Sequence, residues 1–313
     1  MKKITLLLIC FAITFSSYSQ QAASKGSSIA LKVIVEDLPD PFPTTAKVQV
    51  INKLNMLITK NGIASGDLLN RFFITVIATP LTKDITPTAP VQIAQTLEMT
   101  FYVADYYDKK IFATTSVVTK GVGTNETKSY MDAIKHINVN SPVLAKFIDE
   151  GKVKIIDYYN SQAEIIFLQV KALVGQKKFE EALYLLTSIP AECDKYSESL
   201  DLSISVYQQY IDYLCDVNLA LAKSTWMAQQ NSAGAEATAE YLSQIYPDAK
   251  CYGDAQLLYA EIKGKVLDDW KFEMKKWQDG VDLESQRINA FREVGVAYGQ
   301  GQQPTTTNIG WLR

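Results

Sequence analysis

The stretch ALYLLTSIPAEC, Ala182 to Cys193, decides how the second half of this chain folds, because a close copy of it returns 57 residues later. The copy is AEYLSQIYPDAKC, Ala239 to Cys251, with alanine, tyrosine, leucine, proline and cysteine in the same order. Self-similarity at a fixed period is typical of a helical unit that is used more than once and stacked on itself. We therefore expect a helical array here rather than a catalytic pocket.

The region around these copies has a helical pattern from residue 141 to residue 296. Its apolar residues recur at spacings of three and four, and Pro190 and Pro247 are the only prolines between residues 143 and 288. We predict an all-α domain over this range. The segment Asp194–Gln229 has neither glycine nor proline, so it is either one long helix or two helices joined without a marked break.

Within this domain, residues 167–190 resemble a tetratricopeptide repeat. A helix is followed by a turn with Gly175, an aromatic residue at Phe179, the Glu-Ala pair that ends at Ala182, and a second helix that stops at Pro190. Ala182 is small where two helices would cross closely. The resemblance covers about residues 161–270 and implies a helical array that binds a protein. The period of 57 residues exceeds the ~34 of that family, so we expect an extra helix between the copies.

The first half of the chain, residues 29–140, has strand patterns instead. Alternating apolar residues and runs of branched or aromatic ones predict four strands, at 29–36, 71–79, 91–106 and 111–122. The last two are predicted to form a hairpin around the turn at 107–110. Helices are predicted at about 44–61 and 126–137. The order strand, helix, three strands, helix predicts a sheet covered on one face, and the whole chain is expected to be α+β.

The end of the fourth predicted strand carries a short motif, Gly121-Val-Gly123, before a polar helix start at Asn125. With the order of elements, it resembles the small domains of cell-envelope assembly proteins, such as the amino-terminal domain of TolB and the curli-secretion and flagellar-assembly lipoproteins. The resemblance implies a role in assembly at the envelope. A phosphate-binding loop would need glycine in place of Thr127. We therefore expect the glycines to ease a turn and Asn125 to cap the helix.

The two ends of the chain are predicted to lie outside these domains. Lys2-Lys3, an apolar run and the small residues before Gln20 indicate a signal peptide over 1–19, followed by a flexible leader over 20–28. Without the two lysines the net charge changes from −3 to −5, which argues against a nucleic-acid partner. No other apolar stretch is long enough to cross a membrane. We expect an exported protein, periplasmic or associated with the outer membrane.

Three cysteines remain beyond the leader, at positions 193, 215 and 251. Cys193 and Cys215 would lie about 33 Å apart if they shared one helix, which is too far for a disulfide. Cys193 and Cys251, at nearly matching places in the two copies, are the better candidates for a bridge. The alternative is that both are buried apolar thiols.

Two parts of the carboxyl-terminal region are candidates for partner binding. Large apolar residues at spacings of four and three predict a stripe on one helix face, which either packs against the array or binds a partner. From residue 297 to 313 the composition predicts a disordered tail, whose apolar tip at Trp311 is either a docking peptide or a frayed end. The candidate residues are Trp270, Met274, Trp277, Val281 and Trp311.

Catalytic, cofactor and metal sites are not indicated by any pattern in the sequence. His136 is the only histidine and lies on a polar helix, so we expect a solvated side chain. Clustered histidines and closely paired cysteines are absent. Two cooperating carboxylates need not be close in the chain, so the sequence leaves a carbohydrate hydrolase open.

These patterns favour a non-catalytic, exported scaffold that binds another envelope protein through its helical domain. One alternative is a structural subunit that associates with itself into a ring or filament, through its strand edges and the tryptophan stripe. The second alternative is a hydrolase of envelope carbohydrate.

Overall fold

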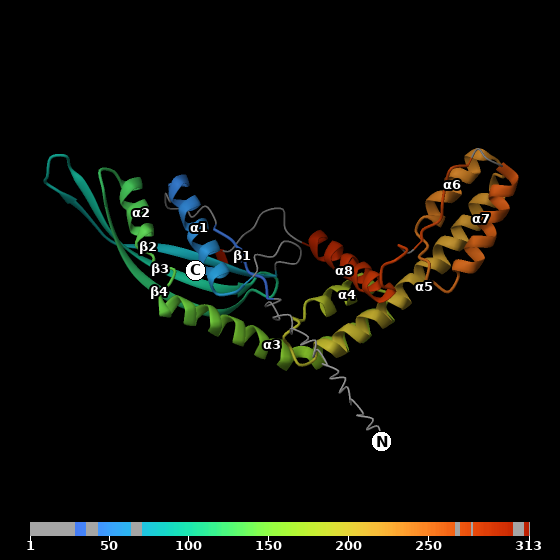
Figure 1. Cartoon of the computed structure of the whole chain (residues 1–313), viewed down its shortest axis with the longest axis horizontal. Helices are drawn as coiled ribbons and strands as arrows, with labels where there is room; N and C mark the ends of the chain where they lie inside the picture. The colour runs from blue at the N-terminus through green and yellow to red at the C-terminus, as the bar shows by residue number, and fades with distance from the viewer. Residues whose placement is uncertain are drawn as a thin grey trace, which may run out of the picture.

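The structure, a computed structural model, describes residues 29–35, 43–63, 71–266, 270–276, 278–302 and 310–312. These residues form a four-stranded mixed sheet followed by a helical array, so the predicted α+β class is confirmed. Figure 1 shows the sheet at one end of the molecule and a helical arm that leads away from it. The predicted signal peptide and leader lie outside the described residues.

The sheet contains its strands in chain order, with β1 parallel to β2 and the other neighbours antiparallel. The hairpin predicted around the turn at 107–110 is confirmed, because Asp105 pairs with Lys110. The second strand extends beyond its predicted end at Thr79 and forms another long hairpin with the third. The strands are β1 (Lys32–Val33), β2 (Phe72–Thr86), β3 (Gln92–Asp105) and β4 (Lys110–Gly123).

One face of the sheet is covered by α1 (Thr44–Lys60), α2 (Glu126–Lys135) and the first part of α3 (Pro142–Gly175). Alternate residues of β3 face these helices and are buried, as the strand period of two requires. They are Leu97, Met99, Phe101 and Val103.

Helix α2 lies very close to the end of β4. A Cβ atom at Gly121 would come within 2.0 Å of the Ser129 carbonyl oxygen, and one at Gly123 within 2.5 Å of the Ser129 nitrogen. Neither glycine has a positive φ, so the two glycines serve close packing of the helix rather than the turn expected from the sequence. The predicted helix cap is confirmed, since Asn125 Oδ1 accepts a hydrogen bond from the Lys128 nitrogen at 2.9 Å.

The helical half repeats one unit, a long helix followed by a short one and a turn that contains proline. Asp194–Gln229 is a single 33-residue helix apart from its ends. The length of this helix accounts for the period of 57 residues. The prediction of an extra helix between the copies is therefore wrong. The first unit is α3 with α4 (Phe179–Thr187), and the second is α5 (Tyr196–Ala228) with α6 (Ser232–Leu242). Two further helices follow, α7 (Tyr252–Val266) and α8 (Leu283–Gly301).

The predicted stripe on one helix is wrong. Residues 270–276 form no regular helix, and α8 begins at Leu283 after a break at Gly280, where φ is +80°, and a cap at Asp282. Trp270 and Met274 are buried, and the Trp270 ring lies 5.2 Å from that of Tyr259 on α7. These two side chains therefore belong to the core of the arm.

The disulfide joins Cys215 to Cys251, with 5.9 Å between their Cα atoms, so the predicted Cys193–Cys251 bridge is wrong. Cys215 lies on the buried face of α5, which meets the start of α7. Cys193 instead lies in the turn after α4 and packs against α3 as a buried free thiol, with its sulfur 3.9 Å from the Ile156 carbonyl oxygen.

The predicted disordered tail is corrected at both of its described ends. Helix α8 continues through Gly301, and Gly310–Leu312 forms a short 3-10 helix on the sheet. Among the described residues, no helix combines the length and apolar character needed to cross a bilayer.

Candidate functional site

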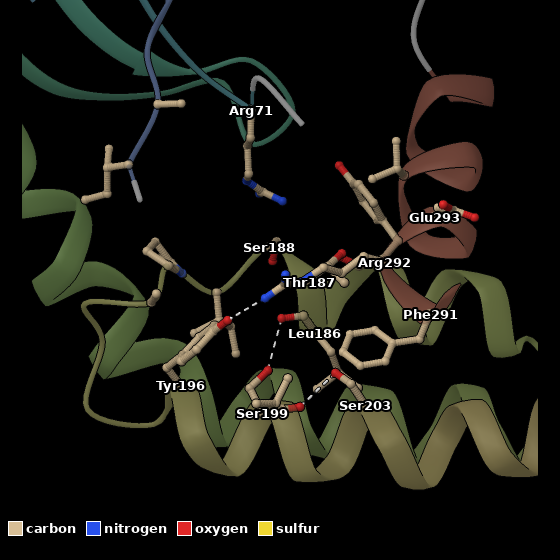
Figure 2. Close-up of a pocket in the computed structure, with 18 of the residues that line it drawn as sticks. Arg71, Leu186, Thr187, Ser188, Tyr196, Ser199, Ser203, Phe291, Arg292 and Glu293 are labelled. Atoms are coloured by element: carbon tan, nitrogen blue, oxygen red, sulfur yellow. Dashed lines mark hydrogen bonds between the residues drawn. The ribbon is translucent and has the colours of Figure 1, made fainter. Parts of the chain in front are cut away.

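A cleft of about 700 Å³ lies where the sheet meets the helical array. Its walls come from segments far apart in the chain: the residues before β1, the start of β2, the turn after β3, the end of α4, the start of α5, and α8. Figure 2 shows the side chains of these segments converging on one space. The cleft is mostly apolar with a few polar groups, which is the usual character of a binding site.

Arg71 occupies the sheet side of the cleft, in a buried polar network. Its guanidinium forms ion pairs with Asp105, which is fully buried, and with Asp108. The backbone nitrogens of Tyr107 and Asp108 donate to Asp105 Oδ1 at 2.8 and 3.0 Å. The Tyr159 hydroxyl donates to Asp105 Oδ2 at 3.4 Å, so the network joins the sheet to α3.

The charges in this network are set by burial and by one another. Burial opposes the charged form of Arg71, but Tyr159, Asp105 and Asp108 outweigh it and raise its pKa, so the guanidinium stays protonated. Burial also raises the pKa of the Asp105 carboxyl, against the opposing effect of Arg71. The guanidinium is also held over the rings of Tyr107 and Tyr159, 5.7 Å from each centroid.

The opposite wall of the cleft is formed by α5 and α8. Arg292 on α8 donates a hydrogen bond from Nη2 to the Tyr196 hydroxyl at 2.9 Å. In Figure 2, Arg71 points into the cavity from the sheet side and Arg292 crosses its far side toward Tyr196. Two guanidinium groups on opposite walls give the cleft donors that can hold carbonyl or acidic groups of a bound chain.

The floor of the cleft offers mainly apolar contact. The Ser199 hydroxyl donates to the Leu186 carbonyl at 3.0 Å, and the Ser203 hydroxyl to the Ser199 carbonyl at 2.8 Å. Both hydroxyl hydrogens are therefore already used within the fold. Phe291 and Leu186 supply apolar surface beside them.

Only one carboxylate, Glu293, is among the described residues that line the cleft, and in Figure 2 it points away from the cavity. Glycoside hydrolysis commonly uses two facing carboxylates. Across the described ranges, no group of three or more histidine, cysteine, aspartate or glutamate side chains could hold a metal ion. His136 is exposed at the end of α2, as expected.

The residues predicted for partner binding do not line this cleft, and the structure does not bring them together. Trp270 and Met274 are buried in the arm, while Val281 is 43% exposed in the turn before α8. Trp311 packs on the sheet, and Trp277 lies outside the described residues.

One signal in the sequence was missed. The chain has only four arginines, and two of them, Arg71 and Arg292, line this cleft. Because the two arginines lie far apart in the chain, no sequence pattern indicated that they line one cleft.

Neither the protein-family models, nor the curated proteins, nor the solved structures include a match to this chain.

Proposed function

We propose that this protein is a non-catalytic, exported scaffold of the cell envelope that holds a segment of another envelope protein in the cleft. The observation that carries the proposal is the cleft itself, which is preformed by elements of both halves of the chain. Its apolar floor suits apolar side chains, and its arginines suit the polar groups of a peptide. The helices α4, α5 and α8 supply most of the wall, in keeping with a partner bound through the helical domain.

The rigidity of the walls supports binding without a large rearrangement. Arg71 is fixed by two carboxylates and two aromatic rings, and Tyr184 packs on both Tyr107 and Tyr298, with centroids 5.7 and 5.9 Å apart. These contacts tie the sheet to α4 and α8. A preorganised site loses less entropy when a partner binds.

Site-specific photocrosslinking in intact cells tests this function. A photoreactive residue at position 297, an exposed place in the cleft, is expected to give a discrete adduct with one partner protein. The matched control is position 168, where Leu168 is exposed on α3 away from the cleft. Equal adduct patterns from both positions, or none from position 297, would count against the proposal.

A second candidate function is self-association into a ring or filament, favoured by the outer edge of the sheet. Strand β4 has 14 residues and pairs only with β3 among the described strands. An unpaired strand edge is a template for adding another strand. Trp270 cannot contribute to such an interface as folded, because it is buried. Light scattering that shows a monomer across a wide range of concentrations would exclude this candidate.

A further inference from the structure

The open face of the sheet, opposite the helices, carries a small apolar patch. Phe73 and Ala104 lie at its centre and are fully buried, with Ile34, Ile77 and Tyr102 packed around them. This cluster is separate from the main core, because successive residues of a strand face opposite sides. Farther along the same face the Thr100 and Ser116 hydroxyls are hydrogen-bonded at 2.9 Å, and Val118 is exposed.

The patch is covered by the chain's own carboxyl-terminal segment. The Trp311 ring packs edge-on against Phe73, with 6.3 Å between centroids and 86° between planes, and Leu312 is 7% exposed. The three residues Gly310–Leu312 thus act as a short apolar ligand for the patch. The apolar tip noted in the sequence has a complementary surface on the same molecule.

The fit of this segment is incomplete. The Trp311 Nε1 atom is buried and has no hydrogen-bond acceptor among the described residues. A buried donor without an acceptor weakens the contact that contains it. The Trp311 ring, by contrast, packs against Phe73, so apolar contact holds the segment on the patch.

We propose that the Trp311–Leu312 segment is an exchangeable docking segment, and that the patch of a second copy of this chain accepts it. Every copy carries both the segment and the patch, and the structure shows the two packed together. Residues 303–309 separate the segment from α8, and seven residues span at most about 25 Å, enough to reach a neighbour in contact. Exchange of an identical element between copies is a common route to association.

The geometry of this exchange sets the kind of assembly. The segment and the patch are different surfaces, so each copy donates one and accepts the other, which gives a head-to-tail ring or filament unless two copies exchange reciprocally. Because the segment is tethered to its own chain, its effective concentration at its own patch is in the millimolar range. Exchange is therefore expected where copies are crowded, and the dilute protein is expected to be a monomer.

Two complementary variants of the full chain test the proposal. The double variant Trp311→Ala, Leu312→Ala has an open patch and no ligand, while Ile77→Lys keeps the segment but places a charge at the patch. Each alone is expected to be a monomer by size-exclusion chromatography with light scattering. A mixture at about 100 μM is expected to form a 1:1 heterodimer, because competition within one chain is removed. A mixture that stays monomeric overturns the proposal.

A peptide measurement keeps the test decisive if Ile77→Lys fails to fold. A labelled peptide of residues 305–313 is expected to bind the double variant at least tenfold more tightly than the wild type, whose own segment competes. The wild-type chain then replaces Ile77→Lys in the mixture, at a concentration raised to the millimolar range so that the open patch of the double variant competes with the wild type's own patch. Failure of the peptide to bind the double variant overturns the proposal. Peptide binding without a heterodimer also overturns it, since the segment would then serve only its own chain.

Discussion

At the scale of single residues, Gly121 shows how closely α2 approaches β4. The change Gly121→Ala is expected to destabilise the protein by ~3 kcal/mol, because the added methyl group would meet the backbone at Ser129 and Ala133. Urea unfolding measures this loss. The control is Gly264→Ala in α7, where nothing lies within 4 Å and alanine should add about 0.5–1 kcal/mol. Similar stabilities for the two variants would contradict the close approach.

The low reactivity of the Cys193 thiol is a second prediction at this scale. Burial, with smaller effects of Glu192 and Asp194, raises its pKa to about 12. In the folded protein at pH 8, Cys193 should therefore resist iodoacetamide, whereas unfolding in urea should expose it to full labelling. Mass spectrometry of the labelled peptides measures the extent of labelling in the folded and in the unfolded protein. Rapid labelling of the native protein would show that the thiol is accessible.

The raised pKa of Cys193 also determines how its contribution to protein stability changes with pH. The unfolded thiol releases its proton near pH 9, while the folded one keeps it up to about pH 12. The contribution of Cys193 is thus complete below pH 9 and is lost as the pH rises from 9 to about 12. The variant Cys193→Ala should lose less stability than the wild type over this range.

At the scale of elements, the sequence patterns that involve residues close in the chain predicted the structure reliably. The β3–β4 hairpin and the Asn125 cap depend on residues close in the chain, and both were predicted correctly. The predicted stripe failed because its spacings of four and three run through residues 270–276, which form no regular helix, and across Gly280, whose φ of +80° does not fit a helix. A glycine within an apolar pattern was thus better evidence against a continuous helix than the spacing was for one.

The disulfide belongs to this scale because it ties α5 to the start of α7 around α6. Reduction with dithiothreitol is expected to cost ~2–4 kcal/mol, since the open chain gains conformational freedom when unfolded. Thermal melts with and without reductant measure the change. A Cys215→Ala, Cys251→Ala variant should be insensitive to reductant, and Cys193→Ala should respond as the wild type does. The opposite ranking would favour a different bridge.

At the scale of the whole molecule, the fold class followed from the two patterns of periodicity, but the cleft did not. Arg71 directly precedes β2 and Arg292 lies on α8, and only the tertiary packing of α4, α5 and the sheet places them across one cavity. No spacing rule connects positions so far apart. The same holds for Trp311 and Phe73, whose contact depends on the path of the chain after α8.

The two halves are also joined by α3, which belongs to both. Its first part packs on the sheet: the Phe147 ring lies 6.3 Å from Phe101, and the Tyr159 ring 5.8 Å from Phe72. Its last part, including Phe167 and Val170, is buried in the same continuous core as the array. The sheet and the array are therefore expected to unfold together.

A fragment of residues 142–302 tests this coupling, because it would expose the sheet-facing side of α3. Each large apolar side chain left in water forfeits about 1.5–3 kcal/mol, and Phe147, Ile148, Ile155 and Tyr159 all lie in the first part of α3. We expect the fragment to melt without a sharp transition and to bind a hydrophobic dye. A chain ending at Gln302 keeps the sheet and serves as the folded control. A monomeric fragment that melts cooperatively within a few degrees of this control would show that the array folds independently and that the junction, including the cleft, is a contact between two autonomous units.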